Sequence, residues 1–243
     1  MVRGLVKSSV KRFGYEILGP KSAYAAQRSL AGLLRQESIN LVLDVGANTG
    51  QFAGELRATG YKGQILSFEP LEAAHAQLSK QAESDPHWRI AIRTALGAET
   101  GIAEIHVSAN SASSSILDML PRHFKAEPLS GYVGKETVTV NRLDDVCAVS
   151  SSDRVFLKVD VQGYESKVLE GAHHILQGCR AVLVEMSLVP LYEGQVLVRD
   201  LWDILAAQGF EPWSLEPGFR HPATGRLLQL DGVFVRAQQN TEA

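Results

Sequence analysis

The sequence predicts an α/β fold with a mostly parallel sheet of seven strands, an antiparallel edge and helices on both faces of the sheet. Two observations lead to this prediction. Short apolar segments alternate along the chain with segments of helical pattern, as in consecutive βα units. In residues 41–52 an apolar run leads through Asp44 into a turn rich in Gly and Asn, and then into a helix-compatible segment. That pattern is typical of the turn where an open α/β sheet binds a nucleotide-like ligand.

Each element follows from its local pattern. A helix at residues 23–34 leads into the first strand, the helix at 51–58 ends near Gly60, and the run at 102–107 alternates as an additional edge strand does. The remaining strands are expected at residues 40–45, 64–68, 89–95, 137–140, 155–159, 181–184, 210–215 and 232–236. The remaining helices are expected at 71–81, 164–176 and 197–207. The last two strands close the sheet as an antiparallel pair.

The composition describes one soluble globular domain. Of 243 residues, 45% are hydrophobic and 21% are charged, and no apolar run reaches the roughly 18 residues that a membrane span needs. We therefore expect a cytoplasmic protein with a helical segment at 1–39 packed on a domain at 40–243. The basic N-terminus lacks the continuous apolar core of a secretory signal, so we expect at most peripheral membrane contact there.

Charge and cysteine content argue against several function classes. A net charge of −3 without a basic stripe gives no reason to expect a nucleic-acid partner. Cys147 and Cys179 are too few for a disulfide framework or a cysteine zinc site. The expected partner is instead a small molecule or a glycan, and a homo-oligomer is compatible with the sequence.

The first turn and the end of the second strand predict a particular ligand. Gly46 and Gly50 allow close backbone approach or positive φ. Glu69 follows Gly50 by some 19 residues and is placed to accept the hydroxyl hydrogens of a ribose. The spacing differs from the Gly-x-Gly-x-x-Gly loop that holds a pyrophosphate, which argues against a nicotinamide-dependent oxidoreductase. A carboxylate at Asp44 that points into the crevice suits the ammonium and sulfonium groups of S-adenosylmethionine.

Further motifs extend this pattern over most of the chain. They are Asp44-Val-Gly-Ala-Asn-Thr-Gly, Phe68-Glu69-Pro70, Ala95-Leu96-Gly97, Ser113-Ser114-Ser115, Arg142-Leu143-Asp144-Asp145 and, most specifically, Lys158-Val159-Asp160-Val161-Gln162-Gly163-Tyr164-Glu165. With these motifs the chain resembles the FkbM-type methyltransferases from about residue 40 to residue 234. The resemblance implies the Rossmann-like class I methyltransferase fold and methyl transfer from S-adenosylmethionine, usually to a hydroxyl of a sugar or a natural product.

The expected donor site lies along these motifs. We expect the donor to contact Asp44, Gly46, Ala47, Asn48, Thr49, Gly50, Glu69, Pro70, Leu96, Gly97, Ser114, Asp160 and Gln162. Asn48 or Thr49 could also cap the helix at 51–58, which is compatible with ligand contact at the same helix N-terminus.

Three carboxylates, those of Asp160, Glu165 and Glu185, are the candidates for catalysis. Asp160 and Glu185 end two neighbouring strands about 4.8 Å apart, so both face one crevice. Either they share an oxygen-ligated cation such as Mg²⁺, or Asp160 acts alone as a general base. Other roles stay open: Asp160 as a helix cap, Glu165 as a first-turn residue favoured by the helix dipole, and Glu185 as a hydrogen-bonded structural carboxylate. His123, in an expected lid at 116–132, is a further candidate base.

The predicted function is O-methylation of a hydroxyl on a sugar of a glycolipid, a polysaccharide or a glycosylated natural product. The alternatives are a methyltransferase for a non-sugar natural-product hydroxyl and a module that binds S-adenosylmethionine without transferring its methyl group. The Asn/Asp-Pro-Pro-Tyr loop of base-amine methyltransferases is missing after residues 155–159, which argues against a nucleic-acid substrate.

Overall fold

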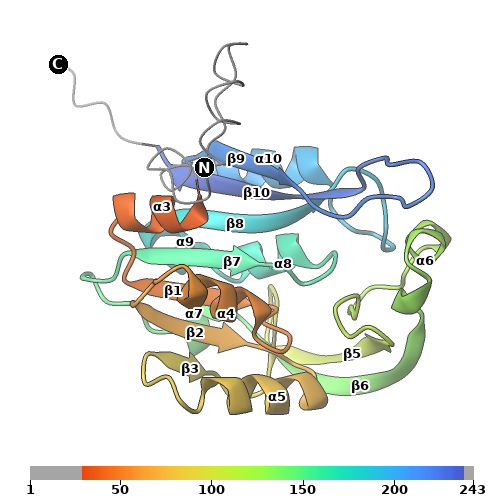
Figure 1. The fold of residues 1–243 in the computed structure, drawn as a ribbon, viewed down its shortest axis with the longest axis horizontal. Coiled ribbons are helices and arrows are strands. Elements are labelled where there is room, and N and C mark those ends of the chain that lie inside the picture. Colours follow the sequence, from red (N-terminus) through yellow and green to blue (C-terminus); the bar gives the residue numbers. More distant parts are fainter. Residues whose placement is uncertain (1–28, 238–243) are drawn as a thin grey trace, which may run out of the picture.

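A computed structural model describes residues 29–237, and its main feature is one twisted sheet of seven strands in the order β3-β2-β1-β7-β8-β10-β9 (Figure 1). The strands are β1 (Leu41–Val45), β2 (Gln64–Phe68), β3 (Trp88–Ile90), β7 (Val155–Val159), β8 (Cys179–Ser187), β9 (Phe210–Pro217) and β10 (Gln229–Arg236). The neighbouring strands β3, β2, β1, β7 and β8 are parallel, and β10 runs antiparallel to both β8 and β9. The predicted mostly parallel sheet with an antiparallel edge is confirmed.

Helices cover both faces of this sheet, which explains why its central strands are apolar throughout. One face carries α3 (Leu30–Gln36), α4 (Gln51–Ala58) and α5 (Glu72–Ala82), and the other carries α7 (Leu143–Val146), α8 (Glu165–Glu170), α9 (His173–Gly178) and α10 (Val198–Ala207). Successive side chains of β1 alternate between the two cores: Leu43 packs in one and Val42 in the other, both fully buried. Each such side chain contributes about 1.5–3 kcal/mol relative to an exposed one.

A small second sheet differs from the prediction. The expected strand at 89–95 is two pieces: β3 pairs with β2, while β4 (Ala95–Leu96) pairs with β6 (Tyr132–Asn141). The expected edge strand at 102–107 is β5 (Gly101–Ser108), which pairs with β6 and not with the main sheet. The chain leaves the main sheet after β3, close to where β2 itself ends at Phe68. The resulting sheet has the order β4-β6-β5. In the sequence, α6 (Pro121–Ala126) and the 3-10 turn η1 (Pro128–Ser130) connect β5 to β6.

The predicted single helix at 164–176 is also two helices, α8 and α9, separated at Gly171 and Ala172. A Cβ atom at Gly171 would lie 1.9 Å from the Gly97 carbonyl oxygen, so the chain crosses the end of β4 too closely for a larger residue. The carboxylate of Asp144 accepts the backbone N–H groups of His174 and Ile175 and thereby caps α9.

The N-terminal prediction is only partly within the described residues. The helix expected at 23–34 is observed from Leu30 as α3, whose Leu33 is fully buried in the core shared with β1. Residues 1–28, most of the expected N-terminal segment, lie outside the described residues. Among residues 29–237, no helix is long and apolar enough to cross a membrane.

Candidate active site

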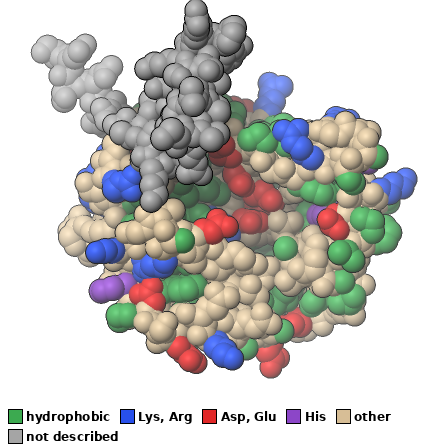
Figure 2. Space-filling view, viewed as in Figure 1, with side chains coloured by type: hydrophobic (Ala, Val, Ile, Leu, Met, Phe, Trp, Pro, Cys, Tyr) green, Lys and Arg blue, Asp and Glu red, His purple; other side chains and the backbone are tan. Residues whose placement is uncertain are grey.

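A cavity of about 430 Å³ opens at the carboxyl ends of the parallel strands. Its walls come from the turns after β1, β2 and β7, from β8 and β10, and from the polar loop that follows β5. Ligands of open α/β sheets bind at this edge. Figure 2 shows acidic side chains in a hollow near the centre of this face.

The glycine turn after β1 forms one wall, but its glycines serve packing more than ligand approach. Gly46 has φ +75°, and a Cβ atom there would lie 1.8 Å from the Asp160 carbonyl oxygen. Gly50 has φ +98°, and a Cβ atom there would lie 2.8 Å from the ring of Trp88. The space beside these two glycines, which was expected to admit a ligand, is therefore taken by the turn after β7 and by the Trp88 ring. Gly50 itself is the N-cap of α4, so neither Asn48 nor Thr49 caps that helix.

Glu69 holds this turn from the end of β2. Its Oε2 accepts the backbone N–H of Asn48 at 2.8 Å, and its Oε1 accepts that of Leu71 at 2.9 Å. Burial raises the pKa of Glu69 to about 7, although both hydrogen bonds favour the charged form. The side chain lines the cavity, and each carboxylate oxygen keeps lone-pair capacity for a further donor such as a ribose hydroxyl.

Asp44 does not face the cavity, which corrects the prediction that its carboxylate meets a ligand's ammonium group. The side chain is fully buried, and the ammonium beside it belongs to Lys158, whose Nζ lies 3.3 Å from Asp44 Oδ1. The Ser67 hydroxyl donates to Asp44 Oδ2 at 3.1 Å. Strand register explains the arrangement, because Asp44 lies directly opposite Ser67 on β2 and opposite Lys158 on β7.

Lys158 is a site residue that the sequence argument missed. Its Nζ donates to the Gly46 carbonyl oxygen at 2.8 Å, and it also lies 3.7 Å from Asp160 Oδ2. The side chain therefore ties the glycine turn to the turn after β7 while it lines the cavity. The available signal was a lysine inside an otherwise apolar strand, where an unpaired charge is not tolerated.

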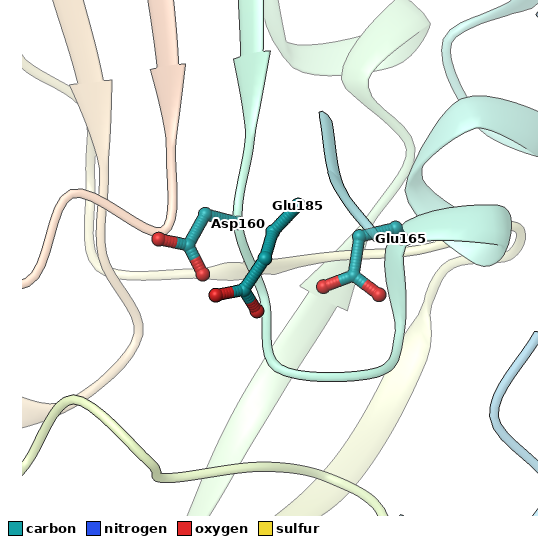
Figure 3. Close-up of side chains that lie close together, drawn as sticks. All are labelled: Asp160, Glu165 and Glu185. Carbon is teal, nitrogen blue, oxygen red and sulfur yellow. The ribbon is translucent and has the colours of Figure 1, made fainter. Parts of the chain in front are cut away.

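The three predicted catalytic carboxylates lie together. Asp160, Glu165 and Glu185 each offer an oxygen within 4.8 Å of the others, and Figure 3 shows their carboxylates turned to the same side. Asp160 follows β7 as predicted, whereas Glu185 lies within β8, which continues to Ser187. Burial, and then the negative charge of Asp160, raise the pKa of Glu185 well above its usual range.

An amide lies between two of these carboxylates. Gln162 Nε2 donates to Asp160 Oδ1 and to Glu185 Oε2, at 2.9 Å each. The amide takes one oxygen of each carboxylate and leaves the other oxygen of each without a hydrogen bond to it, so the predicted Mg²⁺ site at Asp160 and Glu185 stays a prediction. The amide N–H groups between the two carboxylates reduce the repulsion that suggested a cation.

Glu165 holds the turn after β7. Its Oε1 accepts the backbone N–H groups of Val161 and Gly163, both at 3.0 Å, and the residue is 2% exposed. Asp160 caps no helix among residues 29–237, because α8 begins after Tyr164 without a side-chain cap. The carboxylate that satisfies backbone donors in this turn is therefore that of Glu165.

Two residues of β10 lie beside Glu185, and sequence reasoning missed both; Asp231 lines the cavity and Gln229 does not. Gln229 Nε2 donates to Glu185 Oε2 at 2.7 Å, and Asp231 lies directly opposite Glu185 in the β8–β10 pair. Burial, and then the charge of Asp160, raise the pKa of Asp231 to about 6. Within residues 29–237 no hydrogen bond or ion pair involves the Asp231 carboxylate, which lines the cavity.

The polar loop after β5 closes the cavity from the other side. The Ser111 hydroxyl donates to Asn48 Oδ1 at 3.2 Å, and the Ser115 hydroxyl donates to the Gln162 carbonyl oxygen at 2.7 Å. His123, a candidate base from the expected lid, does not line the cavity. It is buried against Tyr192 and Phe219, and burial lowers its pKa to about 4.

Most of the predicted donor residues meet at this cavity. Those that line it are Gly46, Ala47, Asn48, Glu69, Pro70, Leu96, Ser114, Asp160 and Gln162. Those that do not are Asp44, Thr49, Gly50 and Gly97, each of which is a sequence neighbour of a lining residue or lies in the same turn.

A sequence model of the FkbM methyltransferase domain matches residues 44–212, more than half of the chain. The chain belongs to the FkbM methyltransferase family. With this sheet order and this cavity it is an S-adenosylmethionine-dependent methyltransferase of the Rossmann-like class I fold. A curated relative, the 2-O-methyltransferase NoeI of Sinorhizobium fredii, is 26% identical over 207 residues, which cover 82% of this chain and 84% of that protein.

The solved structures that the chain resembles are more distant. The 1,6-didemethyltoxoflavin-N1-methyltransferase of Burkholderia thailandensis, solved with S-adenosylhomocysteine, is 12% identical with a TM-score of 0.46 over 98% of this chain and 88% of its own. An rRNA methylase of Streptococcus thermophilus is 11% identical with a TM-score of 0.48 over 92% of this chain and all of its own. Likeness at this level does not bear on the acceptor.

Proposed function

We propose that this FkbM methyltransferase transfers the methyl group of S-adenosylmethionine to a hydroxyl of an uncharged sugar. The observation that carries the proposal is the acceptor end of the cavity, where the carboxylates of Asp160, Glu185 and Asp231 stand beside the amide of Gln162. Carboxylate oxygens accept hydrogen bonds from hydroxyl groups, of which a sugar has several. The relationship to a 2-O-methyltransferase supports oxygen as the methylated atom.

The other end of the cavity fits the donor. The volume of about 430 Å³ lies within the range of small-molecule sites. Glu69 would hold the ribose hydroxyls, and Gly46, Ala47 and Asn48 would hold the amino-acid part beside the helix N-terminus. S-adenosylmethionine bound there supplies an electrophilic methyl group on a positively charged sulfur.

Asp160 is the residue placed to accept the acceptor's proton. Its Oδ1 is occupied by the Gln162 amide, whereas no hydrogen bond within residues 29–237 reaches its Oδ2, which faces Lys158 Nζ at 3.7 Å. As the O–CH₃ bond forms and the S–CH₃ bond breaks, the hydroxyl proton moves to Asp160 Oδ2 and the electron pair goes to sulfur. Most of the remaining catalysis is alignment of the two reactants.

Replacing Glu69 tests the donor site. Calorimetry is expected to show S-adenosylhomocysteine binding to the wild type and no heat with NAD. Glu69→Ala should weaken this binding by about 1.5–3 kcal/mol, the cost of a lost charge-assisted hydrogen bond. Glu72→Ala, at the exposed start of α5, is the matched control and should bind as the wild type does.

The pH dependence gives this prediction a second readout. Because the pKa of Glu69 is raised to about 7, its accepting carboxylate form is lost as the pH falls through that value. Wild-type affinity should weaken over this range, and Glu69→Ala should lose that part of the dependence. Tight NAD binding without affinity for S-adenosylhomocysteine would contradict the donor assignment.

An acceptor panel tests the substrate class. Burial, and then the charge of Asp160, raise the pKa values of Glu185 and Asp231, so a further carboxylate brought to this wall by a substrate would be disfavoured. With labelled donor, oligosaccharides of neutral hexoses should be methylated and matched oligosaccharides of hexuronates should not. Preferred methylation of the hexuronates, or of a non-sugar hydroxyl compound, would contradict the proposal, and donor binding with no transfer to any acceptor would favour a binding module.

A further inference from the structure

Gln162 is held in an unusual backbone conformation at the centre of the site. It has φ +55°, in the left-handed region that non-glycine residues rarely adopt, and the next residue, Gly163, has φ +99°. Such strain persists only where neighbours fix it. Ser115 fixes the Gln162 carbonyl oxygen, and Glu165 fixes the N–H groups on both sides of Gln162.

All the hydrogen-bonding groups of the Gln162 amide are engaged. Both N–H bonds of Nε2 point at carboxylates, those of Asp160 and Glu185. Oε1 accepts the hydroxyl of Tyr192 at 2.8 Å. A rotated amide would turn its oxygen toward two carboxylate oxygens, which repel it, so the amide orientation is fixed from the carboxylate side as well.

The Tyr192 side chain is held so that its hydroxyl donates a hydrogen bond to the Gln162 amide. It is fully buried, and its ring packs on Gly163, where a Cβ atom would lie 3.1 Å from the ring. Gln195 accepts the backbone N–H of Tyr192 and donates to the Ser187 hydroxyl, which fixes this loop to the end of β8. The hydroxyl has two acceptors within reach, Gln162 Oε1 at 2.8 Å and the Ser113 carbonyl oxygen at 3.3 Å, and donates to the nearer one.

We propose that Tyr192 and Gln162 form a positioning chain that fixes the Asp160 side chain through its Oδ1, so that Oδ2, 3.7 Å from Lys158 Nζ, can accept the acceptor's hydroxyl proton. The chain runs from the Tyr192 hydroxyl through the Gln162 amide to Asp160 Oδ1. Neither residue exchanges a proton with the acceptor, so both act through Asp160. The inference rests on the proposed function because it takes Asp160 as the general base. The general precedent is a catalytic base oriented by a third, buried group.

Removing the Tyr192 hydroxyl is the first test. Tyr192→Phe keeps the ring and its packing on Gly163, so the protein should melt close to the wild type. Its kcat is expected to fall about tenfold, the rate equivalent of one hydrogen bond, while the KM for the acceptor and the affinity for S-adenosylhomocysteine stay unchanged. Tyr132→Phe is the matched control, because that hydroxyl also donates to an oxygen, the Leu117 carbonyl at 2.9 Å, but lies outside the chain. Its kcat should equal that of the wild type.

Gln162→Met provides a second test that does not depend on the first variant folding. Methionine has similar length without the amide, and kcat is expected to fall by about 100-fold because both donors to the carboxylates are lost. The double variant Tyr192→Phe/Gln162→Met should be no slower than Gln162→Met, since two residues of one chain are not additive.

The outcomes separate the inference from the proposed function. If Asp160→Asn is nearly inactive but Tyr192→Phe and Gln162→Met keep the wild-type kcat, or change only KM, the positioning chain is overturned and the base assignment stands. If the losses of the two variants multiply in the double variant, the chain is likewise overturned. Full activity of Asp160→Asn would overturn the proposed base and the chain together.

Discussion

The Asp160→Asn enzyme is expected to turn over about 10²–10⁴-fold more slowly than the wild type, the usual effect of removing an acid–base group. Asparagine keeps the size of the side chain and an oxygen for the Gln162 amide, but it does not take up the hydroxyl proton. Binding of S-adenosylhomocysteine should remain, because Glu69 and the glycine turn hold the donor. Asp145→Asn, on the exposed start of α7, is the control for removal of a surface carboxylate and should keep full activity.

A chelator tests whether the activity depends on a divalent cation. Because Asp160, held through Oδ1 by the Gln162 amide, is proposed to act as a base without a cation, a chelator is expected to leave the wild-type rate unchanged. Loss of activity on chelation, with recovery in Mg²⁺, would mean that the two carboxylates hold a cation as the sequence first suggested. Full activity of Asp160→Asn would remove that residue from the reaction.

The Lys158→Met variant is expected to lose about 3–5 kcal/mol of unfolding free energy, measured by chemical denaturation at neutral pH. The substitution leaves the Asp44 carboxylate fully buried without its cation, and breaking a buried ion pair on one side costs that much. The double variant Asp44→Asn/Lys158→Met should recover most of the loss, because asparagine is uncharged and keeps an oxygen for the Ser67 hydroxyl.

The same variant has a pH dependence of definite sign. Burial raises the pKa of Asp44 in the folded state, so the folded protein binds its proton more tightly than the unfolded chain. Without Lys158, stability should be greatest at acidic pH and should fall as the pH rises from the ordinary carboxyl pKa toward the raised one. A Lys158→Met protein as stable as the wild type at neutral pH would contradict the buried Asp44–Lys158 pair.

The sequence predicted the sheet well because its central strands are continuous apolar runs bounded by turns. The strands at 64–68 and 155–159 and the helix at 51–58 are observed with those bounds. The pieces that were misjudged, at 89–95 and 164–176, depend on where a neighbouring strand ends and on a crossing at Gly171. Neither constraint is local to the residues concerned.

The site was predicted less completely, for a similar reason. Turn residues such as Asn48, Glu69 and Asp160 are marked by their place after apolar strands, and all three line the cavity. The direction of the Asp44 side chain depends on its register with β7, which no local pattern contains. The contacts of Gln229, Asp231 and Tyr192 with Glu185 and Gln162 join residues far apart in the chain, so they follow from the fold alone.

The most direct test of the central claim is to find the atom that receives the methyl group. The enzyme is incubated with S-adenosylmethionine carrying a ¹³C-methyl group and with neutral hexose oligosaccharides, and the product is examined by NMR and mass spectrometry. The expected result is one labelled methyl ether on a sugar oxygen, formed by the wild type and nearly absent with Asp160→Asn. A label on nitrogen or carbon, or an equal yield from Asp160→Asn, would contradict it.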